Sequence, residues 1–178
     1  MTEEERTSAV KFLSACDNKI AKILLGIQCS QVFKLGEKNQ WQDIKMEGSF
    51  YITERNDEEN PHALMVLSTK SLDDLLLSVS DIKSFEVKND DNIKLHALYI
   101  KTESKAEIYC VNFESSEVSN EATSMLKSLK DKRTAKKKVE ELREGLEKLI
   151  IDCLQDSDFI AMLPTIKKGI FKSKSSGV

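Results

Sequence analysis

The chain has 178 residues, of which 40% are hydrophobic and 32% charged, and its formal net charge is −3. These values are ordinary for a soluble globular protein, and the length suits one domain with a helical appendage. No run approaches the roughly 20 apolar residues of a membrane helix, and the N-terminus is acidic where a signal peptide is basic, so we expect an intracellular, soluble protein.

Charge divides the chain into an acidic and a basic part. Residues 1–129 hold 15 Lys and Arg against 22 Asp and Glu, a net of −7, whereas residues 130–178 hold 12 against 8, a net of +4. The hydrophobic pattern changes at the same place. We therefore predict a folded domain over 8–130, a helical extension over 131–172 and a flexible tail over 173–178.

The first predicted element is an amphipathic helix over 9–27. Its apolar residues recur at steps of three and four, and lysines occupy the other side. Asp17 and Asn18 are two poor helix formers in succession and mark a possible break. The apolar stripe either covers one end of a sheet structure or binds a partner protein.

A β-hairpin is predicted next. Residues 31–35 alternate in polarity, a turn containing Gly and Asn follows, and a second run begins at Trp41 and extends to Arg55. Gly48, in the middle of this run, indicates a bulge or a sharp bend. The pattern favours a small barrel.

Further short strands follow at regular spacing. Three of them are predicted from period-two alternation, and polar turns separate them. The stretch 71–79 is interpreted as a helical turn or a packed loop. In total we expect about seven strands in a sandwich or small barrel. After the hairpin, a strand is predicted at 62–69. The three that follow are predicted at 82–88, 95–102 and 106–113.

The apolar period becomes helical after Ser115, and this helix could plug an open barrel end. The basic run 130–138 is interpreted as a solvated helix face or a linker, with a nuclear signal or an RNA contact as alternatives. A coiled-coil spacing begins at Val139, and this stripe must be covered by the barrel or by another copy of the chain. A last helix is predicted from Asp156 or Ser157.

Catalytic patterns are missing from the sequence. His62 and His96 are the only histidines, no phosphate-binding or nucleophile motif occurs, and the four cysteines form no CxxC pair. We therefore expect neither a metal nor another cofactor, and we expect binding in place of catalysis. Trp41, with Phe33 across the hairpin, is the candidate surface for a proline-rich peptide, unless Trp41 is a half-buried core residue.

The string KFLSACDNKIAKILLGIQCSQVFKL, then Trp41, then MEGSFYITER, resembles the decapping protein one family. Members of this family are activating subunits of the mRNA decapping enzyme. The resemblance implies a mainly β fold with α, namely a PH-like, EVH1-like barrel of seven strands. An N-terminal helix and a C-terminal capping helix complete the barrel, and a helical tail follows.

The resemblance also implies roles for individual residues. It predicts that Phe12, Asp17, Lys19 and Arg55 contact the catalytic subunit. It places Phe33 and Trp41 in a groove for proline-rich decapping cofactors.

Two positions depart from the family pattern. Ser68 replaces an expected Asn in the strand MVLSTK, and Asn112 replaces an expected second tryptophan in the last strand. The loss of that ring bears on peptide binding more than on the barrel.

The segment LEKLIIDCLQDSDFIAML is similar to the C-terminal trimerisation segment of animal members of the family. Together with the apolar stripe from Val139 to Leu163, which needs a partner surface, it predicts a homo-oligomer, with a trimer as the expected state. The residues predicted to mediate it are Val139, Leu142, Leu146, Leu149, Phe159 and Leu163.

The sequence thus predicts a non-enzymatic activator of mRNA decapping in cytoplasmic P-bodies, which binds a catalytic subunit of the Nudix type. A general scaffold module that recognises proline-rich peptides is the alternative. A third interpretation is an RNA or phosphoinositide binder that uses residues 130–138.

Overall fold

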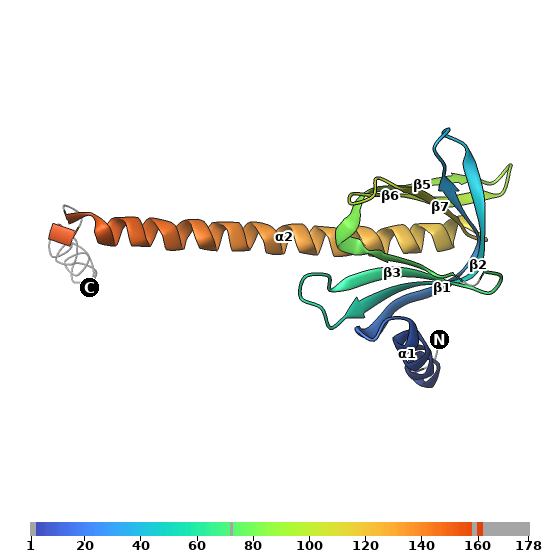
Figure 1. Cartoon of the computed structure of the whole chain (residues 1–178), viewed down its shortest axis with the longest axis horizontal. Helices are drawn as coiled ribbons and strands as arrows, with labels where there is room; N and C mark the ends of the chain where they lie inside the picture. The colour runs from blue at the N-terminus through green and yellow to red at the C-terminus, as the bar shows by residue number, and fades with distance from the viewer. Residues whose placement is uncertain (1–2, 72, 158–159, 162–178) are drawn as a thin grey trace, which may run out of the picture. The chain divides into compact units, whose positions relative to one another are not determined.

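The computed structural model describes residues 3–71, 73–157 and 160–161 (Figure 1). Seven strands lie between two helices in the described residues. In chain order the elements are α1 (Glu3–Cys16), β1 (Ile20–Leu35), β2 (Trp41–Arg55), β3 (His62–Ser68), β4 (Leu75–Ser78), the 3-10 turn η1 (Val79–Asp81), β5 (Ile82–Asp90), β6 (Leu95–Thr102), β7 (Ile108–Asn112) and α2 (Ser116–Gln155).

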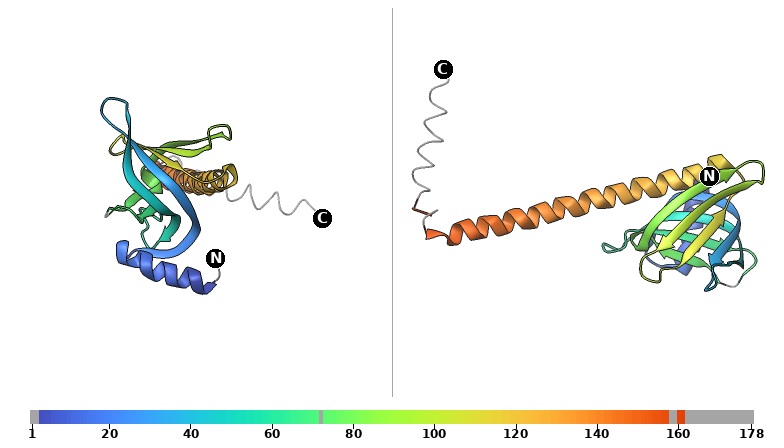
Figure 2. Two further views of the ribbon diagram at one scale, coloured as in Figure 1. Left: turned by 90° about the vertical axis from the view of Figure 1, so that its right-hand side faces the viewer. Right: turned by 90° about the horizontal axis from the view of Figure 1, so that it is seen from above.

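The strands form one antiparallel sheet in the order β4-β3-β2-β1-β7-β6-β5. Figure 2 shows the sheet bent over on itself, with α1 on its outer side. The main core lies inside the bend and contains the ring pair Phe50–Phe113, whose centroids are 5.3 Å apart. Ala122, Leu126 and Leu129 of α2 are buried in the same core, so the first turns of this helix complete it, as predicted.

The prediction of one helix over 9–27 is wrong in its second half. The backbone N–H of Asp17 donates to Leu13 O, and the chain enters β1 at Ile20. Register shifts between Ile20 and Lys22 and between Ile23 and Leu25 interrupt the alternation of β1. Because each bulge moves the buried positions by one residue, a bulged strand imitates the apolar spacing of a helix.

Gly48 bends β2 as predicted. Its φ is +151°, and a Cβ at this position would collide with the carbonyl oxygen of Leu67. The residue pairs with Cys29 on one side and with Ser68 on the other, next to a register shift in β1. A side chain therefore cannot be accommodated where the sheet turns the corner.

The stretch 71–79, interpreted from the sequence as a helical turn or loop, contains a strand. β4 pairs with β3 at the sheet edge, and Leu75 and Leu77 are buried while Leu76 is 45% exposed. The three consecutive leucines hid this alternation in the sequence.

The chain consists of two compact units, residues 1–131 and residues 132–178, and the boundary between them lies within α2. The basic run 130–138 belongs to this continuous helix. Residues 131–138 are exposed, whereas Lys130 Nζ donates to the carbonyl oxygens of Ile82 and Lys83. The run is therefore helical and not an irregular linker, and its function stays a prediction. None of the helices among the described residues combines the length and apolar character that a membrane span requires.

Candidate functional site

Helix α1 presents one apolar side chain to the sheet and the next to solvent. Leu13 is fully buried in a small second core with Ile20, Ile23 and Met65. Phe12 is 66% exposed, since consecutive helical residues point about 100° apart. An exposed phenylalanine of this size, anchored beside a packed residue, is suited to contact another protein.

Strand β4 extends the apolar area next to α1. Leu76 pairs with Met65, which packs against α1, so Leu76 lies on the outer face of the sheet. Cys16 Sγ lies 3.9 Å from Asp74 Oδ2, just before β4. Phe12 is one helical turn from Cys16 and so lies on the same side of α1. We call Phe12, Cys16, Asp74 and Leu76 the α1–β4 surface.

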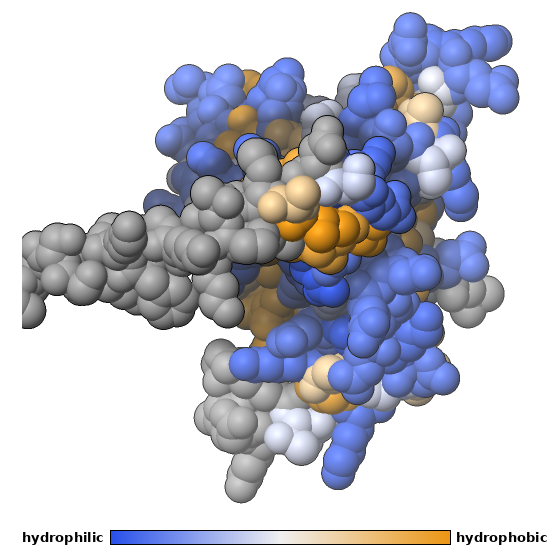
Figure 3. All heavy atoms as spheres, turned by 90° about the vertical axis from the view of Figure 1, so that its left-hand side faces the viewer, coloured by the Kyte–Doolittle hydropathy of each residue, from blue (hydrophilic) through white to orange (hydrophobic). Residues whose placement is uncertain are grey.

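Sequence reasoning found Phe12 but missed Leu76 and Asp74. Leu76 could have been found only if residues 75–78 had been predicted as a strand. In a strand, alternate side chains point to opposite faces, so a leucine between two buried leucines is exposed. Figure 3 shows that hydrophilic residues dominate one face of the molecule, with apolar side chains confined to small patches. Exposed apolar side chains are therefore informative here.

Asp17 and Arg55 meet beneath the surface. Arg55 Nε lies 2.7 Å from Asp17 Oδ2, and the two side chains are only 13% and 7% exposed. These atoms are joined as an ion pair and not by a hydrogen bond of ordinary geometry. The carboxylate also accepts the backbone N–H of Lys19 at 3.1 Å, which fixes the turn from α1 into β1.

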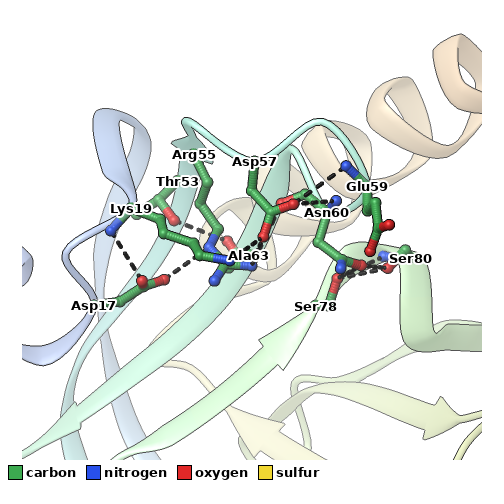
Figure 4. A network of polar contacts seen from close by, with 10 residues as sticks. All are labelled: Asp17, Lys19, Thr53, Arg55, Asp57, Glu59, Asn60, Ala63, Ser78 and Ser80. Carbon is green, nitrogen blue, oxygen red and sulfur yellow. Dashed lines mark hydrogen bonds and ion pairs between the residues drawn. The ribbon is translucent and has the colours of Figure 1, made fainter.

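Asp57 joins this pair to the turn after β2 (Figure 4). It accepts Lys19 Nζ at 2.7 Å and lies 3.8 Å from Arg55 Nη1. The hydrogen bond from Lys19, then the backbone N–H of Asn60, then the nearby positive charges hold the pKa of Asp57 below its ordinary value. The side-chain oxygen of Asn60 in turn accepts the hydroxyls of Ser78 and Ser80. We call Asp17, Lys19, Arg55, Asp57 and Asn60 the polar network.

The polar network connects the end of α1, the turn after β2 and the end of β4. The structure thus brings together three residues predicted to contact a partner, Asp17, Lys19 and Arg55. The side chain of Lys19 is half exposed, whereas Asp17 is buried and Arg55 is nearly so. Direct contact of these three residues with a partner protein stays a prediction. In this structure their polar contacts join the end of α1 to the turn after β2, which in turn contacts β4.

The second predicted surface surrounds Trp41. Trp41 is 45% exposed, and its ring meets Tyr99 edge-on at 5.7 Å between centroids. It pairs with Leu35, and Phe33 lies two residues from Leu35, so Phe33 and Trp41 share a sheet face. Trp41 is therefore a surface residue, although Phe33 is half-buried.

A cavity of about 430 Å³ opens beside Trp41, and we call it the Trp41 groove. Lys88 Nζ lies 5.1 Å from the centroid of the Tyr99 ring. Tyr99 was not predicted from the sequence as part of this surface. Asn112 supplies no ring, and its amide oxygen accepts the backbone N–H of His96 at 3.1 Å. The groove is lined by Trp41, Ser84, Phe85, Glu86, Lys88, Tyr99, Ile100, Lys101 and Ile108.

The predicted oligomerisation stripe lies in the second unit. Val139, Leu142, Leu146 and Leu149 are each more than half exposed on α2. Phe159 and Leu163 lie outside the described residues. Among the described residues, no group of three or more His, Cys, Asp or Glu side chains could hold a metal ion.

Comparison with known proteins gives a family and a fold. Residues 5–128 match a family model described as the Dcp1-like decapping family. The solved structure titled "Crystal structure of Dcp1p" is similar, with a TM-score of 0.56 and 16% identity over 67% of this chain and 93% of that chain. The "Dm DCP1 EVH1 domain in complex with the XRN1 DBM peptide" has a TM-score of 0.57 and 17% identity, over 72% and 91% of the two chains. Curated protein sequences gave no significant match.

These similarities confirm the predicted EVH1-like fold, in which a seven-stranded antiparallel sheet follows one helix and precedes another in the chain.

Proposed function

Because the chain belongs to the Dcp1-like decapping family, we propose that it is a non-catalytic activator of mRNA decapping. It binds a catalytic subunit of the Nudix type through the α1–β4 surface. The binding favours the active state of that enzyme, since a partner shifts a conformational equilibrium by its difference in affinity for the two states.

One observation supports this surface most directly. Phe12 and Leu76 are exposed apolar side chains, and a buried ion pair fixes the elements that carry them. A rigid apolar contact loses little conformational entropy on binding, so it is an efficient anchor for a partner. Asp74 adds a negative charge beside it, which suits a partner surface carrying Lys or Arg.

The test compares matched exposed residues. Phe12→Asp and Leu76→Asp are expected to abolish stimulation of a capped-RNA decapping assay and to weaken binding to the catalytic subunit at least about tenfold. Ile93→Asp is the control, because Ile93 is 69% exposed but lies in the turn between β5 and β6. Equal loss in all three variants, or stimulation unchanged in the first two, would contradict the assignment.

A second function involves the Trp41 groove. A similar structure is an EVH1 domain in complex with a peptide, and the groove here has the exposed ring of Trp41 beside the partly buried ring of Tyr99. We propose that it binds proline-rich segments of other decapping cofactors, or serves as a scaffold module without a decapping role. Trp41 is the sole tryptophan, so its fluorescence should change on titration with such a peptide and stay constant with a scrambled one.

Self-association and location complete the proposal. We propose that the stripe from Val139 to Leu163 forms a homo-oligomer, with a trimer expected, and that the protein resides in cytoplasmic P-bodies. Val139, Leu142, Leu146 and Leu149 are exposed apolar residues of α2. Association with other copies of the chain would remove them from water, which favours the oligomer. The full chain should have the molecular mass of an oligomer in solution, and a chain that ends at Lys130 should have the mass of a monomer. A full chain with the mass of a monomer would contradict oligomerisation.

A further inference from the structure

The second unit begins with a strongly basic stretch of helix. Residues 132–138 read KRTAKKK, all are exposed, and none is acidic. They belong to the continuous helix α2, which suits lysine and arginine because both are good helix formers. We call its five cationic residues the basic segment; they are Lys132, Arg133, Lys136, Lys137 and Lys138.

The charges of the basic segment are poorly compensated. Within the described part of the chain, Lys137 alone among them has an ion pair, at 3.7 Å from Glu141. The next turns of the helix differ, since Arg143 lies 3.7 Å from Glu140 and 3.0 Å from Glu147. The helix is therefore basic over residues 132–138 and acidic over residues 140–155.

Like charges also stand directly above one another in the basic segment. Lys132 and Lys136 are four residues apart, as are Arg133 and Lys137. Such pairs destabilise a helix, and an external polyanion would relieve the repulsion. The repulsion is thus a built-in contribution to the affinity for a polyanion.

We propose that the basic segment binds the phosphate backbone of single-stranded RNA. A membrane helix of the interfacial type needs an apolar face, and residues 132–138 offer only Ala135. A protein interface needs apolar or aromatic anchors, which the segment also lacks. The choice of RNA among polyanions rests on the proposed role in mRNA decapping.

The chemistry of the segment defines how it binds. It contains no aromatic residue on which a base could stack, so it contacts phosphates without reading sequence. Each neutralised phosphate of a single strand contributes about −0.7 to the slope of log affinity against log salt. Three to five contacts would weaken binding roughly 20- to 130-fold between about 50 and 200 mM salt.

The experiment measures fluorescence anisotropy of a labelled oligouridine with the full chain, in the absence of any catalytic subunit. The test variant replaces the five residues of the basic segment by Gln, which keeps helix propensity. Its affinity should fall at least about tenfold and its salt slope should flatten. The matched control replaces five exposed lysines of the first unit by Gln, with the same change in net charge; they are Lys11, Lys22, Lys38, Lys94 and Lys105.

Control binding close to that of the parent supports the proposal. It is overturned if the parent does not bind oligouridine, if the two variants weaken equally, or if anionic vesicles or polyglutamate bind the parent while RNA does not. Far-UV circular dichroism verifies that the helix persists in both variants. Because no decapping partner is present, loss of RNA binding and loss of decapping stimulation are separate results.

Discussion

The α1–β4 surface and the Trp41 groove are built in opposite ways. The first rests on a buried ion pair and a small apolar core, and only Phe12 and Leu76 emerge from it. The second is formed by surface side chains themselves, with the exposed ring of Trp41 edge to face with the half-buried ring of Tyr99. Asp17 and Arg55 therefore lie beneath the first surface and support it, whereas Trp41 itself forms part of the second surface.

This difference predicts how substitutions behave. A change under the α1–β4 surface should alter the free energy of unfolding and, through it, binding. A change in the Trp41 groove should alter affinity with little effect on folding, because exposed residues contribute little to stability. The following predictions test that contrast.

The largest effect is expected from Arg55→Met. This variant leaves the carboxylate of Asp17 buried without its counterion, which costs about 3–5 kcal/mol in comparable buried pairs. Urea unfolding of the domain, followed by circular dichroism, measures the loss.

The double variant Asp17→Leu/Arg55→Met provides the control for that prediction. Removing both charges leaves no orphaned ion, so it should be more stable than Arg55→Met alone. If the double variant were less stable than Arg55→Met alone, the loss of stability in Arg55→Met would not come from the unpaired charge of Asp17.

Adjacent residues of α1 give the next contrast. Leu13→Ala should lower the free energy of unfolding by about 2–4 kcal/mol, because Leu13 is fully buried. Phe12→Ala should change it by less than about 0.5 kcal/mol, because Phe12 is 66% exposed, yet weaken binding to the catalytic subunit. Chemical denaturation and a pull-down with that subunit separate the two outcomes, and similar destabilisation by both would refute the packing described here.

The Trp41 groove permits a gain as well as a loss. Asn112→Trp should raise the affinity for a proline-rich peptide about three- to tenfold, since an added aromatic contact contributes about 0.5–1.5 kcal/mol. Trp41→Ala should lower the affinity with little change in the unfolding midpoint, whereas Asn112→Trp also removes the acceptor of the His96 backbone N–H and should lower the midpoint slightly. Titration of a labelled peptide by anisotropy measures both, and unchanged affinity in Asn112→Trp would mean that this position lies outside the peptide path.

The sequence predicted the sheet, the bend at Gly48 and the capping helix, because alternation and glycine are local signals. It failed between Ile20 and Ile27, where two bulges gave a strand the spacing of a helix. It also failed at β4, where three successive leucines carried no period. Asp17 and Arg55 were predicted as separate partner-contact residues, and their ion pair was not foreseen, because it depends on the packing of α1, which no spacing encodes.

The smallest predicted effect concerns acid sensitivity near the Trp41 groove. Glu107 accepts Lys34 Nζ at 2.6 Å and the hydroxyl of Tyr109 at 2.7 Å, which fastens β1 to β7. The hydrogen bond from Lys34, then that from Tyr109, lowers the pKa of Glu107 below its ordinary value of 4.5. Since the folded pKa is the lower one, the stabilisation is complete above pH 4.5 and is lost as the pH falls through the folded value.

Lys34→Met should therefore flatten the decline in stability below pH 4.5, measured as the thermal midpoint across a pH series. Lys83→Met is the matched control, because its ion pair with Glu103 is 3.3 Å long and both side chains are more than half exposed. It should leave the pH dependence unchanged, since exposed pairs contribute little. A parallel decline in parent and Lys34→Met would show that the contact between β1 and β7 does not depend on the charge of Glu107.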